Sequence, residues 1–203
     1  MRSLLVLALG LSAAASAQVR TSDAPLAGSA GAALGYLADV GWLGPAVGAE
    51  LATEHMGAAA SLTFPGDETA RAFSLAAFVY PGGRRAPVAV ALGAEYDIVA
   101  GGGQSTALLG PIASVSYRLV HQPEVSVVPE VAVGLLFPVT RGYGRDAGLN
   151  VAATASVAIA AQTVLPGVRV SLTPAVSRSV NLDRSYDRAA YAASITVGLT
   201  SDL

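Results

Sequence analysis

The stretch EVSVVPEVAVGLLF, residues 124–137, alternates apolar side chains with small or polar ones along most of its length. Every odd-numbered residue in this stretch is apolar: Val125, Val127, Pro129, Val131, Val133, Leu135 and Phe137. The even positions are mostly small or polar, with Val128 and Leu136 as the exceptions. Because successive side chains of a strand point to opposite faces, this period of two predicts a strand with one continuously apolar face.

The same alternation recurs in nine further stretches, at residues 29–38, 45–54, 56–64, 71–80, 87–99, 107–120, 149–163, 168–177 and 190–200. A length of about ten residues is what a tilted strand needs to cross a bilayer. Tight turns alternate with longer or more polar connectors, as in barrels with short periplasmic turns and longer outer loops. We therefore expect a closed antiparallel β-barrel of about ten strands, or about eight if the 29–38 stretch and one neighbour are not strands.

The composition favours a surface that faces lipid. Apolar residues make up 53% of the chain and charged residues only 13%, whereas a soluble domain carries about 25% charge. A spanning helix needs about 20 mainly apolar residues, and Gly, Pro or charge interrupts nearly every such window beyond the N-terminus. The net charge of −2 gives no electrostatic case for nucleic acid. Without Cys, disulfides and thiolate metal sites are excluded.

The N-terminus has the pattern of a cleavable export signal. Arg2 precedes the apolar run LLVLAL at residues 4–9, and Ala15-Ser16-Ala17 forms a small-x-small cleavage site. We therefore expect a signal peptide over residues 1–17, export by the Sec route, and one barrel domain over residues 18–203. Residues 18–26 show no strand pattern, and we expect them to form a flexible start.

Four prolines lie on the apolar faces of predicted strands, in the segments LGPAVGAE, LGPIASVS, VVPEVAVG and LTPAVSRS (Pro45, Pro111, Pro129 and Pro174). Proline removes a ladder hydrogen bond, so we expect β-bulges at these positions. The pattern Pro-x-(Val/Ala)-x-(Gly/Ser/Ala) resembles the strands of small bacterial outer-membrane β-barrel proteins. The resemblance implies a monomer in the cell outer membrane, with outer-membrane lipid, periplasmic chaperones and the barrel-assembly machinery as partners, and no cofactor.

Six charged residues fall on the predicted inward faces: Glu50, Glu95, Asp97, Arg118, Glu130 and Arg169. A barrel of this size has a narrow interior, where an unpaired charge is costly, so these groups should pair or meet water. We interpret them mainly as a structural network that plugs the lumen. The alternative is a narrow channel for small solutes, in which four carboxylates against two arginines would favour cations.

The sequence offers little for catalysis. His55 and His121 are the only imidazoles, both in predicted periplasmic turns, with no nucleophile elbow and no metal-ligand cluster nearby. We expect a protein that is not an enzyme. Loops carry binding function on barrels, and two polar segments concentrate Arg and Tyr, the residues typical of contact surfaces. They supply candidate contacts Arg141, Tyr143, Arg145, Arg184, Tyr186 and Arg188.

These observations predict an outer-membrane barrel with a structural or surface-interaction role. Besides the narrow channel, one alternative belongs to another class, a secreted or periplasmic soluble β-barrel that binds a lipid. Such a barrel would be apolar inside and charged outside, so the outward faces distinguish the two.

Overall fold

The computed structural model describes residues 18–37, 42–64, 70–101, 103–122, 124–140, 149–182 and 189–202. Its strands are β1 (Ala27–Leu37), β2 (Trp42–Ala52), β3 (Met56–Thr63), β4 (Ala70–Val79), β5 (Val88–Gly101), β6 (Gln104–Tyr117), β7 (Val120–His121), β8 (Val125–Thr140), β9 (Asn150–Gln162), β10 (Val168–Asn181) and β11 (Ala189–Asp202). Since β7 has only two residues, the wall consists of ten long strands, as predicted. Within these described ranges, no helix is long and apolar enough to span a membrane.

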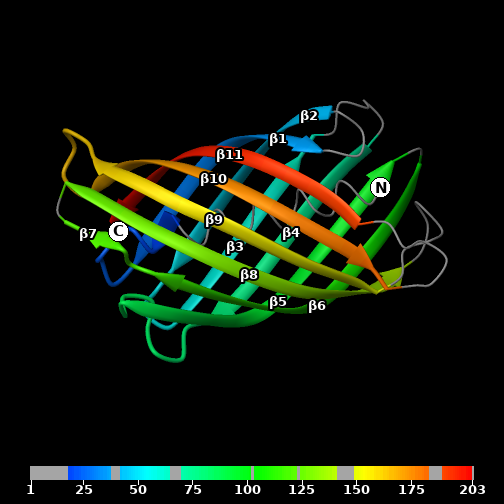
Figure 1. Ribbon diagram of the computed structural model, residues 1–203, viewed down its shortest axis with the longest axis horizontal. Helices are drawn as coiled ribbons and strands as arrows, with labels where there is room; N and C mark the ends of the chain where they lie inside the picture. Colours follow the sequence, from blue (N-terminus) through cyan, green and yellow to red (C-terminus); the bar gives the residue numbers. More distant parts are fainter. Residues whose placement is uncertain are drawn as a thin grey trace.

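The strands form one closed antiparallel barrel. Each long strand pairs with its neighbour in sequence, β1 pairs with β11, and β6 pairs with β8 across the short β7. The turns after β2, β4 and β9 lie at one end of the barrel, together with β7 and the C-terminus, on the left in Figure 1. We call this the turn end, and the opposite end the loop end.

The alternation of side chains decides which face of the wall is apolar. In β8, Val131 and Val133 point outward with exposed fractions of 56% and 50%, while Glu130 between its apolar neighbours is 2% exposed. The two apolar exceptions in this stretch, Val128 and Leu136, are fully buried in the interior. An apolar exterior around a polar interior is the arrangement of a transmembrane barrel. It is the reverse of what the soluble alternative requires.

The predicted bulges at the four prolines are wrong. The strand register is the same on either side of Pro111 and Pro174, but partners are missing beside them on the β8 and β9 sides. Pairing of β2 with β3 begins at Ala46, one residue after Pro45, and pairing of β8 with β6 begins at Glu130, one residue after Pro129. Each proline therefore lies where one neighbour's ladder is interrupted, so no ladder donor is lost there. The register shift that does occur lies between Ala107 and Leu108.

Small residues leave room for aromatic packing inside the turn end. Phe78 and Tyr80 at the end of β4 point inward and are 7% and 2% exposed. Their rings meet edge to face, with centroids 5.4 Å apart and planes at 82°. Gly57 on β3 lies opposite Phe78 in the register, and a Cβ there would lie 2.8 Å from the Phe78 Cζ atom. The absence of a side chain at residue 57 therefore makes space for the Phe78 ring.

Candidate functional site in the barrel lumen

Residues 18–22 form a short segment inside the turn end of the barrel, and we call it the N-terminal segment. All five residues are at most 1% exposed. A tight turn closes the segment, because the Thr21 amide donates to the Gln18 carbonyl at 2.9 Å and the Ser22 amide to the Val19 carbonyl at 3.2 Å. The expectation of a flexible start is therefore wrong for these residues.

Arg84 holds this segment from the β4–β5 turn. Its Nη1 donates to the carbonyls of Val19 at 2.5 Å and Ser22 at 3.0 Å, and its Nη2 to that of Ala24 at 2.5 Å. Its Nε donates to the Thr53 carbonyl in the β2–β3 turn at 3.1 Å. The guanidinium is fully buried, so these carbonyls satisfy a cation that would otherwise be costly to bury.

Two side chains of the segment itself reach the wall. Arg20 donates through Nε to the Ser116 hydroxyl at 2.8 Å and through Nη1 to the Ala86 carbonyl at 3.0 Å. Gln18 donates through Nε2 to the Thr173 hydroxyl at 3.3 Å. The segment is thereby tied to β6 and β10, on different parts of the barrel wall.

Asp23 continues the attachment at the rim. Its carboxylate lies 2.5 Å from Arg118 Nη1 and 2.5 Å from His121 Nε2, while Arg118 Nη2 donates to the Ser22 carbonyl at 2.9 Å. Partial burial by itself raises the pKa of Asp23, but hydrogen bonds from Arg118 and His121, together with their charge, outweigh it. The pKa of Asp23 therefore lies below its usual value of 3.8.

Arg169, at the start of β10, also reaches the segment. It donates to the Thr21 carbonyl and, at 3.1 Å, to the Ser126 hydroxyl. Arg118 and Arg169 were both expected on the inward face. Their hydrogen bonds lead to the N-terminal segment and its rim, which the sequence pattern did not suggest as partners.

The four predicted luminal carboxylates are all buried: Glu50 is 4% exposed, Glu95 1%, Asp97 1% and Glu130 2%. The Ser74 hydroxyl donates to Glu95 at 2.7 Å. Glu50 experiences both the charge of Glu130 and the opposite charge of Arg84. The carboxylates nearest the turn end thus share the interior with the arginines that hold the N-terminal segment.

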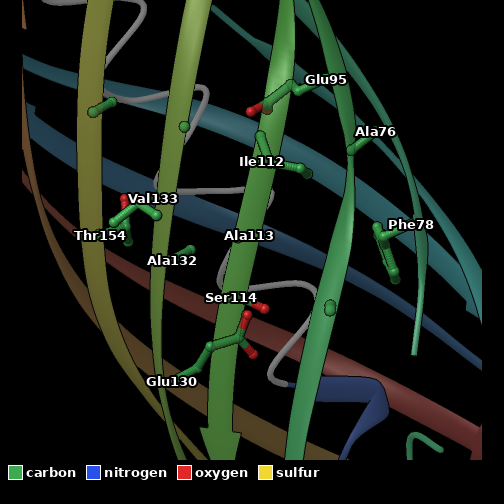
Figure 2. Close-up of a pocket in the computed structure, with 13 residues that line it drawn as sticks. Ala76, Phe78, Glu95, Ile112, Ala113, Ser114, Glu130, Ala132, Val133 and Thr154 are labelled. Atoms are coloured by element: carbon green, nitrogen blue, oxygen red, sulfur yellow. The ribbon is translucent and has the colours of Figure 1, made fainter. Parts of the chain in front are cut away.

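A small cavity separates two of these acids. It has a volume of about 40 Å³ and includes Glu95, Ile112, Ser114 and Glu130 in its lining. Figure 2 shows Glu95 and Glu130 at opposite ends of this space. A water molecule needs a cavity of about 10–15 Å³ on this measure, so the space has room for a few waters.

The loop candidates Arg141, Tyr143, Arg145, Arg184, Tyr186 and Arg188 lie outside the described residues. Sequence reasoning missed Arg20 and Arg84, which it left in a flexible start and in a turn. The one available hint was that Arg84 is a charged residue beside a glycine pair in a chain with only 13% charge.

An acid, an imidazole and a hydroxyl meet at the rim. His121 lies between Asp23, 2.5 Å from Nε2, and Ser126, whose Oγ is 3.3 Å from Nδ1. The contacts follow the order of a catalytic triad, but Ser126 is fully buried and also accepts a hydrogen bond from Arg169. A substrate therefore has no access to this hydroxyl. Among the described residues, no group of three potential metal ligands comes together.

No protein-family model matches the chain, and no curated protein matches it. Solved structures with a similar outline include Neisserial surface protein A, at 12% identity and a TM-score of 0.46 over 88% of this chain and 97% of that one. A KdgM porin in complex with disordered oligogalacturonate matches at 8% identity and a TM-score of 0.43, over 86% and 99% of the two chains. The translocator domain of autotransporter NalP from Neisseria meningitidis matches at 14% identity and a TM-score of 0.40, over 94% of this chain and 92% of that one.

None of these TM-scores reaches 0.5, so the solved structures support no inference beyond what the chain's own fold shows. That fold defines the class. The chain is a closed ten-stranded antiparallel β-barrel with an apolar exterior and a polar lumen.

Proposed function

We propose that this protein is an outer-membrane β-barrel with a structural role, and that its own N-terminal segment closes the lumen at the turn end. The observation that carries the proposal is the complete burial of residues 18–22 under hydrogen bonds from Arg20, Arg84 and Arg169. A solute entering from the turn end would have to displace this segment.

The placement in the outer membrane rests on the chain's own features. The outward faces are apolar over ten strands, and the chain begins with the features of an export signal at residues 1–17. In the orientation with short turns on the periplasmic side, the N-terminal segment faces the periplasm. The protein would act as a monomer, delivered by periplasmic chaperones and inserted by the barrel-assembly machinery.

Planar-bilayer conductance tests the closed lumen. We expect the wild-type protein to conduct negligibly and the double variant Arg20→Ala/Arg84→Ala to conduct, because most of the hydrogen bonds that hold the segment in the lumen are then lost. Arg85→Ala is the matched control, since Arg85 is exposed, pairs with Glu54 at the surface and makes only one exposed hydrogen bond of 3.3 Å to the Asp23 carbonyl, none to residues 18–22. A steady wild-type conductance that the double variant does not change would contradict the proposal.

A narrow cation-selective channel is the second candidate, and the cavity between Glu95 and Glu130 favours it. In that case the wild-type protein would conduct, and Glu95→Gln with Asp97→Asn would lower both the conductance and the preference for cations. Silent wild-type bilayers would exclude this candidate. We assign no catalytic role to His121, because Ser126 is buried.

A surface-interaction role would use the candidates that the sequence supplies, Arg141, Tyr143 and Arg145 together with Arg184, Tyr186 and Arg188. Composition supports this role, since Tyr and Arg are enriched at contact surfaces. Replacing each triplet by Ser and measuring adhesion of cells that display the protein would test it, with unchanged adhesion counting against a loop contact.

A further inference from the structure

The outer wall has charged residues at two places only along the described strands. Arg71 at the start of β4 and Arg178 near the end of β10 both point outward. Both lie at the loop end, and all other outward positions on the described strands are uncharged. A cation is costly in the middle of a lipid-facing wall and tolerated near the interface, so the two arginines lie at the level of lipid headgroups.

Arg178 is supported on the wall by an aromatic ring. Its guanidinium lies 5.4 Å from the centroid of Tyr191 on the neighbouring β11. Its cross-strand partner on the other side is Ala153. No described carboxylate forms an ion pair with Arg178. The stacked guanidinium therefore keeps its hydrogen-bond donors available, and its planar geometry suits a phosphate.

A groove in the wall begins beside this arginine. It lies over β1, β2 and β11, has a volume of about 680 Å³, and includes Leu34, Tyr36, Pro45, Val47, Ala193 and Ile195 in its lining. This volume falls in the range of roughly 300–1,000 Å³ typical of small-molecule sites. Short side chains on the outward face contribute to the hollow, because Ala32 of β1 and Ala193 of β11 each carry only a methyl group beside Leu34 and Tyr36.

The groove ends close to the aromatic ring that supports the cation. Ala193 in the groove lies two residues from Tyr191 on the same face of β11, and Tyr36 of β1 pairs with Ala193. A molecule that placed an anion on Arg178 could therefore extend an apolar tail into the groove on the wall.

We propose that this surface binds one anionic lipid, with its headgroup phosphate on Arg178 and an acyl chain in the groove between β11, β1 and β2. The proposal rests on the membrane placement proposed above. The charge of Arg178 suits an anionic headgroup, and the apolar lining of the groove suits an acyl chain. A lipid therefore fits both the cation and the groove, whereas a free anion fits only the cation.

Native mass spectrometry of the full chain, released from detergent after titration with phosphatidylglycerol, tests the proposal. We expect a single retained lipid adduct on the wild-type protein. Arg178→Gln should weaken its apparent affinity about tenfold or more, the loss that follows from one charge-assisted contact. Ala193→Trp, which fills the groove and leaves the charge, should weaken the adduct as well. Arg71→Gln is the matched control, because this outward arginine lies on β4, away from the groove, and its removal should leave the adduct unchanged.

Four outcomes would overturn the inference. They are an adduct that Arg178→Gln leaves unchanged, equal losses in Arg71→Gln, a ladder of adducts typical of unspecific annular lipid, and displacement by inorganic phosphate. Heat-modifiable migration on gels verifies that each variant is folded. If Arg178→Gln does not fold, Arg178→Lys takes its place. If the protein stays monodisperse without detergent, the membrane placement fails. If it needs detergent but retains no Arg178-dependent lipid, only this inference fails.

Discussion

At the scale of single residues, Arg84 has the largest share in holding the N-terminal segment. It lies in the β4–β5 turn, yet its guanidinium donates to three carbonyls between Val19 and Ala24. Replacing it with Ala should lower the free energy of unfolding by about 3 kcal/mol, because buried hydrogen bonds to a charged group are lost. Arg85→Ala removes an exposed pair with Glu54 and an exposed hydrogen bond of 3.3 Å to the Asp23 carbonyl, and it should change stability by less than about 1 kcal/mol.

Urea unfolding in lipid vesicles measures both values. Arg84→Lys separates charge from geometry, because lysine keeps the cation without the planar fork of donors. We expect Arg84→Lys to lose most of the unfolding free energy that Arg84→Ala loses. Equal stability of the Arg84→Ala and Arg85→Ala variants would show that Arg84 does not hold the segment.

Asp23 gives the rim of the segment a dependence on pH. Its pKa lies below the usual 3.8 in the folded protein. A carboxyl with a depressed folded pKa adds stability above its unfolded pKa and loses it as the pH falls through the folded value. The advantage of the wild type over Asp23→Asn should therefore be constant near neutral pH and shrink below about pH 4.

Unfolding free energies of the two proteins between pH 3 and pH 7 test this sign, with Arg118 and His121 left in place in both. An advantage that grew on acidification would mean that the ion pair with Arg118 and His121 is not what holds Asp23.

At the scale of elements, the contact between β3 and β4 depends on a glycine. A Cβ at Gly57 would lie 2.8 Å from the Cζ atom of Phe78, whose ring packs on Tyr80. Gly57→Ala should destabilise the barrel by about 1–3 kcal/mol through overpacking. In Gly82→Ala the new Cβ has no atom within 4 Å, so this turn variant is the control. Phe78→Leu combined with Gly57→Ala should recover part of the loss, and a double-mutant cycle that showed no coupling would exclude the steric explanation.

The strands were predictable from the sequence, and the N-terminal segment was not, for a physical reason. A strand such as Val125–Thr140 carries its period of two within a few neighbouring residues, because one face is apolar and points outward while the other points into the lumen. The N-terminal segment has no such periodicity. Its partners are remote, with Arg20 and Ser116 separated by 96 positions and Gln18 and Thr173 by 155. The inward positions of Glu50 and Glu130 followed from the alternation. That Arg84 lies near Glu50 and Arg20 near Glu130 became visible only in the closed barrel.

At the scale of the whole molecule, the apolar exterior predicts how the barrel responds to charge at different heights. Val133 lies in the middle of β8 and is 50% exposed, whereas Val164 lies in the β9–β10 turn and is 98% exposed. In lipid vesicles, Val133→Arg should cost about 2–4 kcal/mol, because the guanidinium would enter the centre of the hydrocarbon. Val164→Arg should change stability by no more than about 0.5 kcal/mol, since its side chain already meets water. A water-soluble barrel would tolerate both substitutions equally, because an outward arginine would be hydrated at either position. Urea titrations of both variants therefore distinguish a wall that faces lipid from one that faces water, independently of whether the lumen conducts.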